Sequence, residues 1–171
     1  IRSSSNYGRR DGCEQLSHKV GRMAILVTGA SGFLGSEVVP RLLARRLKVY
    51  ALSRSISEPL VSTDTLTLIK GDLTQKSLGI SNLPRDIDSI LHLAALTSLG
   101  QKHKDRTETI NLGGTTEALK LAISAKLEHF FHASTLYVSG DYDREFGESD
   151  FYVGQRWRNP YETSKFQAEA L

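Results

Sequence analysis

The sequence of 171 residues predicts an α/β fold, a doubly wound parallel sheet with helices on both of its faces. Two observations lead to this prediction. From residue 23 onward, short apolar runs alternate with segments of helical spacing, and strands joined by crossover helices form parallel sheets. The first apolar run, MAILVT, is continuous and ends in glycines, as expected of a strand that is buried on both faces.

Five strands and three helices account for the alternation. The predicted strands cover residues 23–28, 48–53, 65–70, 89–95 and 128–135. The predicted helices cover residues 33–46 and 107–127, and a third begins near Tyr161. Pro40 interrupts the first helical pattern and can bend that helix.

Positive charge is confined to the amino-terminal segment. The chain has a net charge of +3, but residues 1–22 hold five basic and two acidic residues, so the rest carries no net charge. This distribution argues against a nucleic-acid partner. Residues 1–22 are rich in Ser, Gly and Arg without an apolar period, so we expect a disordered basic tail before Met23, the expected natural start. The only cysteine, Cys13, lies in this tail, which leaves no thiol chemistry for the core.

The remaining composition is that of a soluble globular protein, with 39% hydrophobic and 24% charged residues. No apolar run is long enough to span a membrane, and the first residues lack the apolar stretch of a signal peptide. A membrane partner is therefore not expected, and the predicted location is the cytoplasm.

The stretch VTGASGFLG places Gly29, Gly32 and Gly35 between the first strand and the first helix. Glycines there allow a tight turn, close approach of the backbone to a pyrophosphate and close helix packing, while the helix amino terminus presents N–H groups to the anion. A glycine-rich turn that binds nothing is the alternative. The position between a strand and a helix favours the phosphate-binding turn.

The G-x-x-G-x-x-G spacing resembles that of the extended short-chain dehydrogenase/reductase superfamily, which includes NAD(P)-dependent epimerases and dehydratases. The resemblance covers about residues 23–171 and implies an NAD(P)-binding Rossmann domain. That fold usually has roughly six or more strands. We therefore expect residues 23–171 to be the amino-terminal part of a longer enzyme, truncated before the last strands and the substrate-binding region and inactive alone.

The resemblance also implies a set of cofactor-binding residues. In LSRS, Arg54 occupies the cofactor-selecting place, where an acid would bind a ribose 2'-hydroxyl and an arginine can clamp a 2'-phosphate. NADP is therefore the expected cofactor and NAD the alternative, while a solvent-facing Arg54 is the competing interpretation. In KGDLT, Asp72 matches an acidic residue beside the adenine, although an aspartate there can also cap a helix. The complete predicted set is Gly29, Ser31, Gly32, Phe33, Leu34, Gly35, Arg54, Asp72, Leu73, Leu93, Ala94, Ala95, Tyr161 and Lys165.

In HLAA, the small Ala94 and Ala95 are expected to let the cofactor approach. His92 is expected to pack in its strand rather than bind a metal, because no second ligand has suitable spacing. No metal site is predicted.

Tyr161 and Lys165 lie four residues apart, so on a helix they share one face. By the resemblance they are the catalytic tyrosine and lysine. A free phenol titrates near pH ~10, so the charge of Lys165 would stabilise the phenolate while also holding the nicotinamide ribose. Tyr161 would then exchange a proton with a substrate oxygen.

The same resemblance assigns the remaining catalytic positions. Thr135 in STLYVSG matches the catalytic hydroxyl, with the neighbouring Ser134 as the alternative. Asn111 in INLGG matches the asparagine that holds the active-site hydrogen bonds, and a polar residue on a helix surface is the competing interpretation.

A loop of 20 residues separates Gly140 from Tyr161, and loops of such length often bind ligands. Trp157 could cover a substrate there, and Arg156 or Arg158 could meet a phosphate or carboxylate. Partly exposed packing residues are the equal alternative.

The leading interpretation is an NADP-dependent oxidoreductase, epimerase or dehydratase acting on a hydroxyl or carbonyl substrate such as a nucleotide sugar. An acyl-thioester reductase is a second enzyme hypothesis, favoured by Thr135 and Arg54. A non-catalytic dinucleotide-binding scaffold or redox sensor is a third, disfavoured because it would need none of the catalytic side chains. The predicted partner is a small-molecule substrate, and a homodimer is left open.

Overall fold

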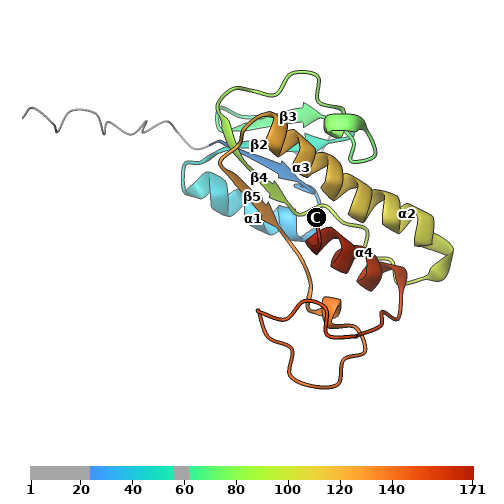
Figure 1. Cartoon of the computed structure of the whole chain (residues 1–171). Coiled ribbons are helices and arrows are strands. Elements are labelled where there is room, and N and C mark those ends of the chain that lie inside the picture. The colour runs from blue at the N-terminus through green and yellow to red at the C-terminus, as the bar shows by residue number, and fades with distance from the viewer. Residues whose placement is uncertain (1–23, 56–61) are drawn as a thin grey trace, which may run out of the picture.

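The computed structural model describes residues 24–55 and 62–171, so the predicted tail over residues 1–22 lies outside the described residues. A five-stranded parallel sheet with the order β3-β2-β1-β4-β5 forms the centre (Figure 1). Its strands are β1 Ala24–Thr28, β2 Lys48–Ser53, β3 Leu66–Lys70, β4 Ile87–His92 and β5 His129–His132. This sheet confirms the predicted fold class. The chain reverses its direction of winding between β1 and β4, where ligands bind in open α/β sheets.

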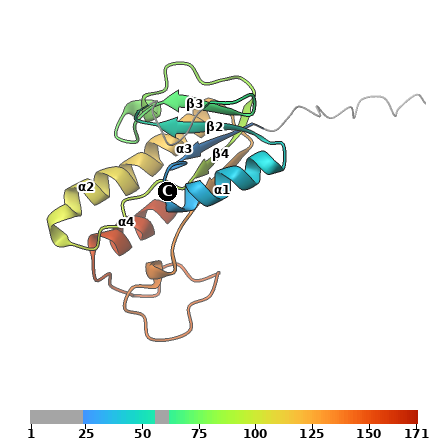
Figure 2. The ribbon, with the colours of Figure 1, turned by 180° about the vertical axis from the view of Figure 1, so that it is seen from behind.

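Helices cover the sheet on both faces, as Figures 1 and 2 show. The helices are α1 Phe33–Ala44, α2 Lys104–Glu108, α3 Gly114–Ser124 and α4 Pro160–Glu169. Alternate residues of β1 divide between two hydrophobic clusters. Leu26 packs in the cluster that holds Leu121 of α3, and Val27 packs in the cluster that holds Val39 of α1. The continuous apolar run of β1 is therefore explained by burial on both faces.

Four short turns of helix complete the described elements. Three are 3-10 turns, η1 Lys76–Gly79, η2 Gln101–His103 and η4 Leu136–Ser139. The fourth, η3 Thr109–Gly113, is a π-helical turn that joins α2 to α3. None of the helices in the described parts of the chain combines the length and apolar character needed to cross a bilayer.

The prediction of one helix over residues 107–127 was wrong in its boundaries. The helical run starts at Lys104, contains the π turn and ends at Ser124. It stops early because Lys126 takes a left-handed conformation, with φ 54°, which turns the chain toward β5.

The predicted fourth and fifth strands also differ from the observed ones. β4 begins two residues before residue 89, and the chain leaves the sheet after His92 to follow the pocket described below. β5 is confined to His129–His132 and lies at the sheet edge among the described strands, with Phe131 50% exposed.

Candidate active site

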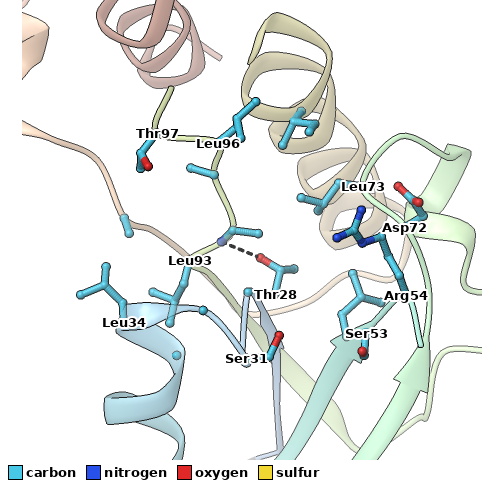
Figure 3. A pocket seen from close by; sticks show the side chains of 18 of the residues that line it. Thr28, Ser31, Leu34, Ser53, Arg54, Asp72, Leu73, Leu93, Leu96 and Thr97 are labelled. Carbon is cyan, nitrogen blue, oxygen red and sulfur yellow. Dashed lines mark hydrogen bonds between the residues drawn. The ribbon is translucent and has the colours of Figure 1, made fainter. Parts of the chain in front are cut away.

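A pocket of about 990 Å³ lies along the carboxyl ends of the central strands. This volume is at the upper end of the range of roughly 300–1,000 Å³ that is typical of ligand sites. Every residue predicted to bind a cofactor lines it. Figure 3 shows Arg54 and Asp72 together on one side of the pocket and Leu34 and Thr97 on the opposite side.

The three glycines of the first turn have three different surroundings. Gly29 has φ 72°, and a Cβ there would lie 2.7 Å from the backbone nitrogen of Ala94. A Cβ on Gly35 would overlap the carbonyl oxygens of Gly29 and Ala30, so this glycine allows α1 to pack against the turn. Gly32 is exposed, and a Cβ there would meet one described atom, the Gly29 oxygen at 3.2 Å.

The amino terminus of α1 has the features of an anion-binding site. Its N-cap residue, Gly32, makes no side-chain hydrogen bond to the first turn, and that turn contains no acidic residue. The first N–H groups of a helix have no partner within the helix, and the helix dipole favours negative charge there. With the open face of Gly32, these N–H groups fit a phosphate or pyrophosphate.

Arg54 and Asp72 follow β2 and β3 at one end of the pocket. Arg54 is exposed and lines the pocket. Asp72 accepts hydrogen bonds from the backbone N–H and the hydroxyl of Thr74, both at 2.8 Å. These two bonds, with a smaller contribution from the charge of Arg54, hold the pKa of Asp72 below its usual value. Asp72 therefore closes a turn and does not cap a helix, because η1 begins at Lys76 with Gln75 as its N-cap.

Local capping fixes the start of α4. The Asn159 side chain accepts the N–H of Glu162 at 3.0 Å and donates to the Glu162 carboxylate at 2.9 Å. Pro160 occupies the first turn, where its missing N–H costs nothing. With the helix start fixed, Tyr161 and Lys165 both face the pocket, which confirms the predicted shared face.

Lys165 is the buried cation of the site, with 2% of its surface exposed. Its Nζ donates to the carbonyl of Ala133 at 2.7 Å and lies 3.0 Å from Nε2 of His132. Burial lowers the pKa of Lys165 to about 8, while Glu169 opposes the shift. Lys165 therefore brings a positive charge to the end of the pocket that Tyr161 lines.

Asn111 is buried, so the helix-surface interpretation was wrong. Its Oδ1 accepts the N–H of Leu96 at 2.7 Å, and its Nδ2 donates to the Leu96 carbonyl at 3.0 Å and to Ser164 Oγ at 2.9 Å. The side chain lies outside the pocket lining. Asn111 instead ties the loop after β4 to α4, and so holds two walls of the pocket together.

The structure separates the two candidate hydroxyl residues. Ser134 lines the pocket, whereas Thr135 is not part of its lining. Thr135 Oγ1 accepts the N–H of Tyr137 at 3.3 Å and caps η4. His92 packs in β4 as predicted: it is 1% exposed, and its ring nitrogens lie 2.8 Å from Thr28 Oγ1 and 3.2 Å from Thr115 Oγ1.

The three loop residues considered for substrate contact lie outside this pocket. Trp157 donates to the carbonyl of Val138 at 3.0 Å. Arg156 pairs with Asp141 at 3.2 Å, and Arg158 lies 3.4 Å from the Glu162 carboxylate. Their contacts match the packing interpretation.

Sequence reasoning missed five pocket-lining residues on the loop after β4 and on the following helical run, namely Leu96, Thr97, Arg106, Thr109 and Ile110. Thr97 lies on an irregular loop that gave no periodic signal. One indication was present in the sequence for the residues of the helical run: Arg106, Thr109 and Ile110 lie one to five positions before Asn111, which was predicted to belong to the site.

Known proteins resemble this chain over most of its described length. Residues 25–171 match the model of the NAD dependent epimerase/dehydratase family. A 3-beta-hydroxysteroid dehydrogenase of Mycolicibacterium neoaurum is 30% identical over 152 residues, which cover 85% of this chain and 41% of that protein. This chain thus spans less than half of that relative. A polyketide synthase-nonribosomal peptide synthetase of Phaeosphaeria nodorum is 28% identical over 156 residues, covering 78% of this chain and 4% of that protein.

Among solved structures, the UDP-glucuronic acid 4-epimerase from Bacillus cereus in complex with NAD is similar with a TM-score of 0.71. It is 28% identical, and the match covers 86% of this chain and 50% of that one. The family match, the parallel sheet and the glycine turn agree with one another. The chain belongs to the NAD dependent epimerase/dehydratase family, within the short-chain dehydrogenase/reductase superfamily.

Proposed function

We propose that this chain binds NADP in the pocket, and that the protein containing it transfers hydride between NADP and a carbon bearing a hydroxyl or carbonyl group. One observation supports this most strongly. A single pocket is lined by Arg54 after β2, by the glycine turn, and by Tyr161 and Lys165 on α4. A dinucleotide has an adenosine end, a pyrophosphate and a nicotinamide end, which these three parts fit in turn.

Arg54 supports NADP over NAD. It follows the last residue of β2, where an acid would select the ribose 2'-hydroxyl, and Ser53 and Ser55 flank it. Among the described residues, no carboxylate lies within ion-pair distance of Arg54. Its guanidinium is exposed at the pocket, and its planar donors are well suited to a 2'-phosphate.

The other end of the pocket holds the proposed acid–base chemistry. The nicotinamide, when bound, gives or takes the hydride. Tyr161 passes a proton to or from the substrate oxygen, and the ammonium of Lys165 stabilises the phenolate and holds the ribose. Ser134 and Thr135 are both candidates for the hydroxyl that binds the substrate oxygen, since the sequence favours Thr135 while Ser134 lines the pocket.

Titration calorimetry of NADP and NAD against the purified chain tests the cofactor. We expect NADP to bind more tightly than NAD. Arg54→Ala should lower the affinity for NADP by about tenfold, because one charge-assisted pair is lost, and should leave the affinity for NAD nearly unchanged. Arg85→Ala, an exposed arginine outside the pocket, is the matched control. Equal affinities for the two cofactors in the unmodified chain would refute the NADP assignment.

For the substrate, we propose a small alcohol or ketone, with nucleotide sugars as the leading class. The B. cereus relative is named a UDP-glucuronic acid 4-epimerase, and the M. neoaurum relative is named for a hydroxysteroid. A reductase of acyl thioesters is the second candidate, suggested by Thr135 and Arg54, and the P. nodorum relative is named a polyketide synthase-nonribosomal peptide synthetase. Product analysis with a UDP-sugar, a hydroxysteroid and an acyl thioester, each with the longer protein, separates the three: release of an aldehyde or alcohol from the thioester alone would select the second candidate.

A further inference from the structure

The ammonium of Lys165 is held by two consecutive residues of the chain at the end of β5. Nζ lies 2.7 Å from the Ala133 carbonyl and 3.0 Å from Nε2 of His132. An ammonium has three donors. Two of them are thus directed at β5 and its end, which leaves the third for the pocket that Lys165 lines.

This contact dictates the protonation of His132. A lysine ammonium donates and cannot accept, so Nε2 must be the acceptor, and the neutral ring carries its proton on Nδ1. Nδ1 is buried and has no hydrogen-bond partner among the described residues. Burial and the charge of Lys165 lower the pKa of His132 to about 4, so the ring is neutral at pH 7. The unpaired Nδ1–H costs free energy, and the ring's remaining hydrogen bond is the one to Lys165.

A second histidine holds the His132 ring in place. The ring of His92 stacks on it, with centroids 5.6 Å apart and planes 19° apart, and His92 is itself held by Thr28 and Thr115. Burial, followed by the charges that His132 and Lys165 both carry at low pH, lowers the pKa of His92 to about 3. The neighbour from β4 is therefore neutral as well.

On α4, the other titratable groups near Lys165 are Tyr161, which lines the same pocket, and Glu169, whose charge favours the ammonium. Glu169 is exposed, so solvent screens its charge. The acceptors that contact Nζ directly are then His132 and the Ala133 carbonyl.

We propose that His132 is a positioning residue for Lys165: its neutral Nε2 accepts one ammonium proton, fixes Nζ beside the pocket and stabilises the charged form of the lysine. The role of that charge in cofactor binding and proton transfer rests on the function proposed above. The hydrogen bond between His132 and Lys165 does not depend on that function. His129 provides a contrast on the same strand, because it is exposed and its ring lies tilted against that of Phe131 instead.

The titration of Lys165 in the cofactor-free chain measures this interaction. The lysines are labelled with ¹³C, the Cε signal is followed with pH, and the Lys165 signal is assigned by its absence in Lys165→Met. His132→Phe keeps a ring but removes the acceptor, so the midpoint should fall by about one pH unit, because the charged form loses a hydrogen bond. His132→Gln retains an acceptor, so its Lys165 midpoint should stay close to that of the unmodified chain. His129→Phe should leave the Lys165 midpoint unchanged.

An unchanged midpoint in His132→Phe would overturn the proposal, as would a fall in His132→Gln as large as in His132→Phe. If His132→Phe does not fold, His132→Met removes the acceptor with a flexible side chain and is judged by the same criterion. NADP affinity measured against pH gives a second readout, whose alkaline decline should begin about one unit lower in His132→Phe. Absence of NADP binding by the unmodified chain would refute the proposed function alone, since the lysine midpoint still decides the role of His132.

Discussion

At the glycine turn the pocket is formed by backbone, whereas at α4 buried polar side chains hold its walls together. The turn depends on missing side chains: Gly29 and Gly35 permit approaches that a Cβ would block. The α4 end depends on contacts between distant parts of the chain, such as Asn111 with Ser164 and Lys165 with Ala133. The glycine turn is thus sensitive to an added Cβ, and the α4 end is sensitive to the loss of a polar side chain.

The largest effect is expected at the α4 end, in catalysis. Tyr161→Phe keeps the ring and removes the acid, so turnover by the longer protein should fall by about 10²- to 10⁴-fold, the usual contribution of a positioned acid–base group. Cofactor affinity should change little, because the ring remains. Tyr152→Phe, at an exposed tyrosine outside the pocket, is the control for steady-state kinetics. Near-normal turnover in Tyr161→Phe would mean that another group handles the proton.

At the glycine turn, the expected effect falls on stability and binding together. Alanine normally stabilises a helix relative to glycine. Gly35→Ala should instead destabilise the fold by about 3 kcal/mol and weaken NADP binding, because its Cβ overlaps backbone oxygens that cannot move independently. Gly113→Ala is the matched control, since a Cβ there meets nothing within 4 Å. Denaturant unfolding of both variants compares them, and equal stabilities would contradict the packing role of Gly35.

Loss of one side chain should damage the α4 end. Asn111→Ala leaves the N–H and carbonyl of Leu96 without their side-chain partner, which should cost about 2 kcal/mol of unfolding free energy. Asn82→Ala, at an exposed position, should change stability by less than about 0.5 kcal/mol. A similar small change in Asn111→Ala would show that water replaces its hydrogen bonds.

The remaining contrast is a pH dependence with opposite signs for binding and stability. The pKa of Lys165 is lowered from 10.5 to about 8 in the fold, so between these values the unfolded chain holds the extra proton. Stability should therefore rise as pH increases from about 8 to 10.5, relative to Lys165→Met. NADP affinity should fall over the same range as the ammonium is lost. Denaturation and calorimetry at matched pH values measure both, and parallel trends would contradict a buried, charged Lys165.

The same contrast explains what could be predicted from sequence. Local patterns predict the sheet, the glycine turn and the pocket positions of Arg54 and Asp72. A strand end or a glycine spacing can be recognised from a few consecutive residues. The contact of Lys165 with His132 joins residues 33 positions apart, and no local pattern indicates it. The π turn at Thr109–Gly113 was missed for a related reason, since it contacts α4, which lies far along the chain. The left-handed Lys126 was missed because a lysine gives no sequence signal for a positive φ.

The central claim is that a single pocket holds the whole dinucleotide, from the glycine turn at one end to α4 at the other. A crystal structure of the chain with NADP would test this claim most directly. We expect the 2'-phosphate within hydrogen-bond distance of Arg54, the pyrophosphate over Gly32 at the start of α1, and the nicotinamide ribose within hydrogen-bond distance of Lys165. A dinucleotide bound elsewhere, or one whose nicotinamide ribose lies beyond the reach of Lys165, would contradict it.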